Sequence, residues 1–318
     1  MILYTVGISK LSVIQYKAER DRISELKIAI NEELATCEDF VAYEKSLKEK
    51  MKGMEAHDKT EVIDLYIYYL GQHANTVLSN QDRIDLVTTL NPGIIAPDMV
   101  EKENIADKIK TLQSLHILTR IKDGDIKNII DYDYFINEYS GSFTPGYIDV
   151  LNLYKDEETN EFISVNTNKV IPGIVTKRLD SIYSSLQKPN IDDAKALLES
   201  AYEYYKAVYL GAFDEESIKG EDGKILDEIV ESYKTYNPAD KELGSLLREI
   251  IPMLEKSENE LTDEIKEVIT HAMGYEHQHD ESVMADVPEL DVSSTVKETE
   301  STEDASTKEE TTETLENN

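Results

Sequence analysis

Three of the six histidines, His271, His277 and His279, lie within nine residues of one another near the C-terminal end of the chain. Neutral imidazoles and carboxylates are the ligands that zinc and nickel sites use, and Glu276 and Asp280 lie beside them. Two ligands on one helix need a spacing of three or four residues, whereas His277 and His279 are two apart, which converges only in an extended chain. We therefore interpret these side chains as solvated histidines and predict no bound metal and no cofactor.

Residues 81–130 follow the order of a winged helix-turn-helix, with helices expected at 81–90 and 103–114 and a β-hairpin after them. Ile105, Ile109 and Leu112 are expected to face the core. The polar and basic side chains expected on the outer surface are Asn104, Lys108, Thr111, Arg120, Lys122 and Lys127. Such side chains contact bases and phosphates in DNA-binding proteins of this kind. The connection 91–100 is long and the second helix is acidic, so a purely structural role for this segment is favoured.

Cys37 is the only cysteine, which excludes an intrachain disulfide and is consistent with a reducing compartment. Its neighbours Leu34, Phe40 and Val41 recur at helical spacing, which indicates a buried thiol rather than a nucleophile. The sequence contains no glycine-rich phosphate loop and no GxSxG, HExxH or CxxC motif. No catalytic residue is predicted, and the sequence leaves enzymatic activity open without arguing for it.

Four tyrosines occur on the helix expected at 192–210. Tyr202, Tyr205 and Tyr209 step by three and four residues and are predicted to share a core face. Tyr204 lies on the opposite side beside Val208, and we expect this pair to be exposed. An exposed tyrosine next to an apolar side chain is typical of protein interfaces, so Tyr204 and Val208 are predicted interaction residues.

The chain has 33 Lys and Arg against 65 Asp and Glu, a formal charge of −32. Such a charge repels nucleic acid and anionic membranes, so a nucleic-acid role would need a local basic patch or mimicry of nucleic acid. The apolar run at residues 1–8 is too short for a signal peptide and indicates a first strand. No segment has the length of a membrane span. We expect a protein that is neither secreted nor membrane-spanning, located in the cytoplasm, or in a virion if it is viral.

The elements up to residue 170 follow from apolar spacing and turn residues. Apolar positions from 23 to 54 step by three and four, which predicts one long amphipathic helix ending at Gly53. Asp58, with a glutamate three residues later, resembles a capping box that opens a second helix. The Asp123-Gly124 turn predicts a hairpin that pairs residue 121 with 126, 119 with 128, and 117 with 130. A second hairpin is predicted from 148–154 to 162–165.

Beyond residue 171 the pattern is helical, with helices expected at 175–186, 192–210, 224–236, 240–254 and 262–273. Residues 281–318 contain twelve acidic and two basic residues and no aromatic residue, which is typical of a disordered segment. The predicted fold is therefore mainly α, with a small β-hairpin-containing middle region, a C-terminal helical bundle and a disordered acidic tail. The predicted regions are 1–90 (helical), 91–170 (mixed, with two hairpins), 171–280 (helical bundle) and 281–318 (tail).

These features favour a non-enzymatic interaction or assembly protein that binds protein partners or itself. A viral (phage) structural or assembly component would have such a profile. One alternative is an acidic regulator that acts on nucleic acid through the winged segment or by mimicry. Another is a metal-dependent enzyme that uses His271, His277 and His279.

Overall fold

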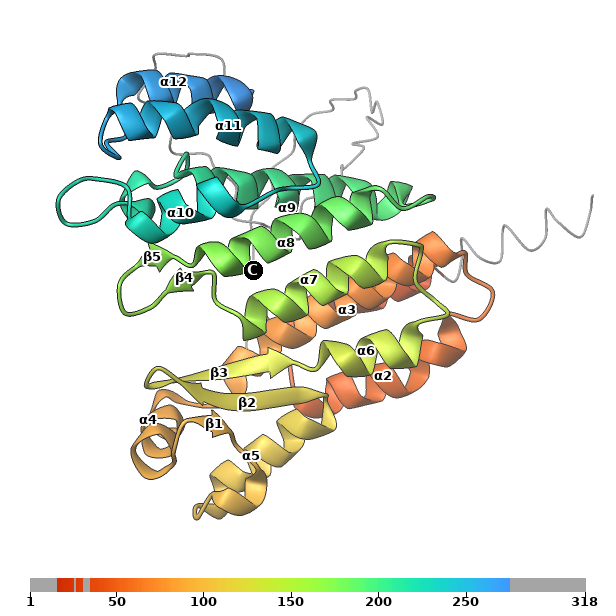
Figure 1. Cartoon of the computed structure of the whole chain (residues 1–318). Helices are drawn as coiled ribbons and strands as arrows, with labels where there is room; N and C mark the ends of the chain where they lie inside the picture. Colours follow the sequence, from red (N-terminus) through yellow and green to blue (C-terminus); the bar gives the residue numbers. More distant parts are fainter. Residues whose placement is uncertain (1–15, 26, 31–34, 275–318) are drawn as a thin grey trace, which may run out of the picture. The chain divides into compact units, whose positions relative to one another are not determined.

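The computed structural model describes residues 16–25, 27–30 and 35–274 (Figure 1). This part of the chain is mainly helical and has a small antiparallel sheet in the middle, which confirms the predicted fold class. The strand predicted at residues 1–8 and the tail at 281–318 lie outside the described residues. Within the described part, no helix has the length and apolar character needed to cross a membrane.

The single long helix predicted from 23 to 54 is wrong, because the helical residues 16–25 and 27–30 are followed by a separate helix, α2 (Cys37–Lys50). Thr36 caps α2. Its hydroxyl accepts the Asp39 N–H, while the Asp39 carboxylate accepts the Thr36 N–H at 2.9 Å. This capping box starts a new helix inside an unbroken apolar pattern. The predicted end of the helix near Gly53 is confirmed.

The next helix, α3 (Ala56–Val77), begins two residues before Asp58, and its N-cap residue, Glu55, makes no side-chain capping bond. The capping box predicted at Asp58 is therefore wrong. The core face of α3 includes Ile63, Tyr66 and Leu70, all fully buried. Through this face α3 packs on α5 (Glu103–Ser114) and β3 (Asp125–Ile130).

The middle of the chain forms a three-stranded antiparallel sheet in the order β1-β2-β3, with α4 (Asn80–Thr89) and the short helix η1 (Pro97–Met99) beside it. Strand β1 (Gly93–Ile94) pairs with β2 (Ile117–Lys122), which pairs with β3. The predicted register of the hairpin is confirmed at all three pairs. Asp123 and Gly124 have φ of 54° and 80°, the left-handed conformation that a two-residue hairpin turn requires.

The second predicted hairpin is wrong, because residues 148–154 belong to α7 (Tyr147–Thr159), which follows α6 (Tyr132–Tyr139). Tyr147, Val150 and Leu151 are all buried, a helical spacing of three and four. Only the end of the prediction corresponds to a strand. A two-stranded sheet forms there from β4 (Ile163–Ser164) and β5 (Lys169–Val170).

The C-terminal helices begin and end within a few residues of the predicted limits. They are α8 (Pro172–Leu186), α9 (Asp192–Leu210), α10 (Asp227–Thr235), α11 (Lys241–Lys256) and α12 (Asp263–Ala272), with the short helix η2 (Glu215–Ile218) between α9 and α10. Helix α8 packs along α9, α10 contacts α8 and α11, and α11 contacts α12. One cluster of buried apolar side chains extends from Ile23 to Ile269.

Arg178 on α8 has a buried guanidinium, 3% exposed, that connects three helices. Its Nε donates to Asp156 Oδ2 at 2.5 Å, its Nη1 to the Tyr205 hydroxyl at 3.0 Å, and its Nη2 to the carbonyl oxygens of Asp156 and Asn160. The guanidinium also lies over the rings of Phe162 and Tyr205, 5.3 and 5.1 Å from their centroids. The end of α7 is thereby fixed to α8 and α9.

Gly211 ends α9 in the left-handed conformation, and a Cβ at this position would overlap the side chain of Ile218. We expect Gly211→Ala to lower the free energy of unfolding by about 2–4 kcal/mol, through backbone strain and overpacking together. Gly223 has the same conformation, with φ of 77°, but nothing lies within 4 Å of its added Cβ. Gly223→Ala should therefore cost only about 1–2 kcal/mol. Urea unfolding measures both, and equal losses would contradict the packing contribution.

Candidate functional site

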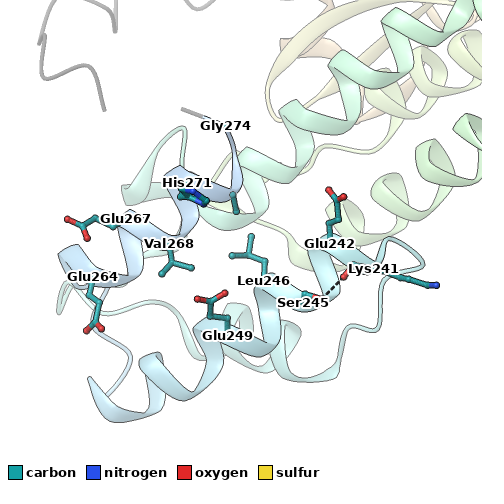
Figure 2. A pocket seen from close by; sticks show the side chains of 11 residues that line it. Lys241, Glu242, Ser245, Leu246, Glu249, Glu264, Glu267, Val268, His271 and Gly274 are labelled. Atoms are coloured by element: carbon teal, nitrogen blue, oxygen red, sulfur yellow. Dashed lines mark hydrogen bonds between the residues drawn. The ribbon is translucent and has the colours of Figure 1, made fainter. Parts of the chain in front are cut away.

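A groove of about 1070 Å³ lies along α11 and α12 (Figure 2). Leu246 and Val268 face each other from the two helices and form its floor. Ala272 also lines the groove. The rest of the lining is polar and comprises Lys241, Glu242, Ser245, Glu249, Glu264, Glu267, His271 and Gly274. The groove thus combines an apolar floor with walls rich in carboxylates.

Both helices are amphipathic, which is why they leave this groove between their polar edges. Helix α11 buries Leu243, Leu247, Ile250 and Leu254, and α12 buries Ile265 and Ile269. Spacings of three and four residues place these side chains on one face of each helix. The groove residues of α11, from 241 to 249, and those of α12, from 264 to 272, lie beside these buried faces.

The start of α11 is held by a buried hydrogen bond. Asp240 caps the helix by accepting the Glu242 N–H at 2.9 Å, and it also accepts the Tyr202 hydroxyl of α9 at 2.7 Å. At the other end of the helix, the Asn259 carbonyl accepts the Ile225 N–H at 2.9 Å. These bonds fix the wall of the groove to the core of the C-terminal helices.

The walls of the groove are acidic and uncompensated. Glu242, Glu249, Glu264 and Glu267 are all exposed, and none of them forms an ion pair with another residue of the described part of the chain. Lys241 is the lining residue with a permanent positive charge. Carboxylates of one sign along a cleft create a local negative potential that attracts cations.

The groove is open rather than enclosed, because nine of its eleven lining residues are exposed. Sites for small molecules enclose most of the ligand surface within mainly apolar walls. A shallow groove between two helices instead matches the surface that receives a segment of another protein.

Of the three predicted cluster histidines, the structure describes one. His271 is exposed on the last turn of α12 and lines the groove, whereas His277 and His279 lie outside the described residues. Among residues 16–25, 27–30 and 35–274, no group of three or more His, Cys, Asp or Glu side chains is placed to hold a metal ion.

In the winged segment, the predicted core residues Ile105, Ile109 and Leu112 are buried as expected. The Lys108 side chain is 37% exposed, and its ammonium binds Asp82 in the first turn of α4 at 2.6 Å. Its charge is therefore partly offset within the chain.

The predicted cations of the hairpin lie together on one face of the sheet, where Arg120 is the cross-strand partner of Lys127. Lys122 and Lys127 both bind Glu161, at 2.8 and 3.2 Å. These two lysines share one carboxylate, which offsets one of their two charges and lowers the positive potential available to a phosphate backbone.

On α9, the predicted core face is confirmed and the predicted exposed face is wrong. Tyr202, Tyr205 and Tyr209 are buried as predicted, but Val208 is also buried, at 6% exposure. Tyr204 is half-buried, and its ring contacts Phe162 and Phe213 at centroid distances of 6.0 and 5.5 Å. The predicted exposure of Val208 is therefore wrong, and Phe162, before β4, and Phe213, after α9, cover part of Tyr204.

Two polar contacts were missed because their partners are distant in the sequence. Cys37 Sγ lies 3.3 Å from His73 Nε2, while burial raises the pKa of the thiol and lowers that of the imidazole, so neither group favours its charged form. Glu44, which fills an apolar slot in the helical pattern, accepts the hydroxyls of Tyr66 and Tyr134 at 3.1 and 2.8 Å. Neither arrangement has the activated nucleophile of a catalytic site.

Two further acids, Asp64 on α3 and Glu158 on α7, are half-buried. Burial raises the pKa of Asp64 to about 6 although it accepts the Tyr147 hydroxyl, and it raises the pKa of Glu158 to about 7. Glu158 Oε2 has no hydrogen-bond partner among the described residues. These groups lie away from the groove, and they bear on stability rather than on binding.

No family model, no curated protein and no solved structure matches the chain. The role of the groove therefore has to be argued from its own geometry and charge.

The raised pKa of Glu158 predicts a loss of stability at neutral and alkaline pH. Because the folded state holds a proton on Glu158 that the unfolded state has released above about pH 4.5, stability falls as the pH rises toward and through 7. We expect Glu158 to lower the free energy of unfolding by about 1–2 kcal/mol as the pH rises from about 5 to about 8, after allowing for partial solvent exposure. Urea unfolding at these two pH values should show a smaller fall in the free energy of unfolding for Glu158→Gln than for the wild type. An unchanged pH dependence, matching that of the exposed control Glu228→Gln, would refute the assignment.

Proposed function

We propose that this chain is a non-enzymatic interaction protein and that the groove between α11 and α12 receives a segment of a partner protein. The observation that supports this proposal is the open groove itself, with Leu246 and Val268 on its floor and exposed polar walls. An apolar floor with a polar rim is the usual anatomy of a protein-binding surface.

The apolar floor of the groove suits a helix of a partner protein. A helix that enters a groove buries the apolar side chains of one face and leaves its other faces in water. The floor is formed by side chains of two adjacent helices, held by the Asp240 cap and by the loop before α12. A pre-formed surface of this kind binds without a large ordering cost on its own side.

The winged segment supports the alternative, a nucleic-acid regulator, less well. Its order of helices, strands and hairpin is present, but Lys108, Lys122 and Lys127 are each paired with a carboxylate. The formal charge of −32 adds long-range repulsion toward a phosphate backbone. The groove between α11 and α12 attracts cations, so the negative charge of the chain does not oppose the binding proposed for it.

The proposal is tested by selecting peptides of about 16 residues from a random display library on the full chain. We expect binders with micromolar Kd, and we expect Val268→Asp to weaken them at least about tenfold by placing a charge on the apolar floor. The matched control is Val165→Asp, because Val165 is 60% exposed in the turn after β4. It should change the affinity by less than about twofold.

Circular dichroism melting of both variants establishes that the fold is retained. If the selected peptides bind Val268→Asp as tightly as the wild type, or if Val165→Asp weakens them equally, the groove is not the docking surface.

A further inference from the structure

We infer that the segment that fits this groove is a basic amphipathic helix. This inference rests on the function proposed above and adds the chemistry of the partner. It is drawn from the arrangement of carboxylates around the apolar floor, from the absence of ion pairs at these carboxylates within the described part of the chain, and from the charge of the other candidate occupants.

The carboxylates stand on both walls of the floor. On α11, Glu242 and Glu249 are seven residues apart and therefore lie on one face, two turns from each other. On α12, Glu264 and Glu267 form the facing row. A helix with an apolar stripe flanked by Lys or Arg would place its apolar side chains on Leu246 and Val268 and its cations against both rows. The pattern of the groove is complementary to that of a basic amphipathic helix.

Two charged side chains elsewhere on the same two helices form ion pairs, whereas the groove glutamates form none within the described part of the chain. Glu255 of α11 binds Lys234 at 2.9 Å, and Lys266 of α12 binds Glu215 at 2.7 Å. The four groove glutamates have no such partner among the described residues. Water-exposed carboxylates that share a cleft repel one another, and an incoming cation relieves that repulsion.

The length of the groove sets the size of the contact. The lining residues of α11 span from 241 to 249, which is roughly two helical turns or about 12 Å. A partner helix would place one apolar side chain per turn on the floor, with basic residues three and four positions away.

Two other occupants carry the wrong charge. Residues 281–318 of this chain contain twelve acidic and two basic residues, so the carboxylates of the groove repel this segment. A second copy brings a formal charge of −32 and an acidic groove of its own. Like charges brought together at an interface cost free energy and suppress such pairings.

The test uses two synthetic peptides of about 18 residues with leucine at the same helical positions and either lysine or glutamate elsewhere. Fluorescence anisotropy with the full chain at about 0.15 M salt should show binding of the Leu/Lys peptide with a Kd of about 10 µM and none of the Leu/Glu peptide. The double variant Glu249→Lys, Glu267→Lys should weaken the Leu/Lys peptide at least about tenfold.

The control must separate the groove from the general negative charge of the protein. Glu228 and Glu231 are exposed on α10 and three residues apart, so Glu228→Lys, Glu231→Lys changes the net charge by the same amount away from the groove. This variant should change the affinity by less than about twofold. Equal weakening by the two double variants would show non-specific attraction and overturn the inference.

Removal of residues 281–318 should leave the affinity for the Leu/Lys peptide within about twofold. A gain of more than about tenfold would show that the acidic segment occupies the groove, and this too would overturn the inference. The proposed function is tested separately by the library-selected peptides. If those peptides depend on Val268 but are not basic, the function stands and only the inference about the partner fails.

Discussion

The buried guanidinium of Arg178 is the interaction on which the arrangement of the C-terminal helices depends. A buried cation costs several kcal/mol unless an opposite charge and hydrogen bonds replace its water. Arg178 obtains them from the Asp156 carboxylate and from two carbonyls at the end of α7, and it adds the Tyr205 hydroxyl of α9. Helices α7, α8 and α9 therefore cannot slide past one another without leaving a charge unpaired. Tyr205 extends the contact by donating to Glu157.

The position of the groove depends on α9, one of the three helices that Arg178 joins. Tyr202 lies almost one turn before Tyr205 and donates to Asp240, the residue that caps α11. Since the first wall of the groove begins at that cap, its position follows from the packing of α9 on the core. The side chains that α11 and α12 do not use for this packing face water, and carboxylates are the largest group among them. The residues that α11 and α12 bury and the carboxylates of the groove thus lie on different faces of the same two helices.

Features specified by a few neighbouring residues could be predicted from the sequence. The hairpin register follows from Asp123-Gly124, and the limits of α9 follow from its apolar spacing and Gly211. The break before α2 was missed because the capping box at Thr36 interrupts no apolar pattern. The contacts of Arg178 and the groove join segments tens of residues apart, so no local pattern specifies them. The helices α11 and α12 were predicted one by one, whereas their groove arises only when they pack.

The tyrosines that donate to carboxylates set an alkaline limit on the fold. Tyr134 is bound to Glu44, Tyr147 to Asp64 and Tyr202 to Asp240, and ionisation of any of these phenols would place two anions side by side. Burial is the main cause that raises their pKa, and the neighbouring carboxylate raises it further. These phenols therefore lose their protons only when the surrounding helices separate. In strong base, phenolate formation and loss of structure become one cooperative event, which the ultraviolet absorbance of the protein itself records.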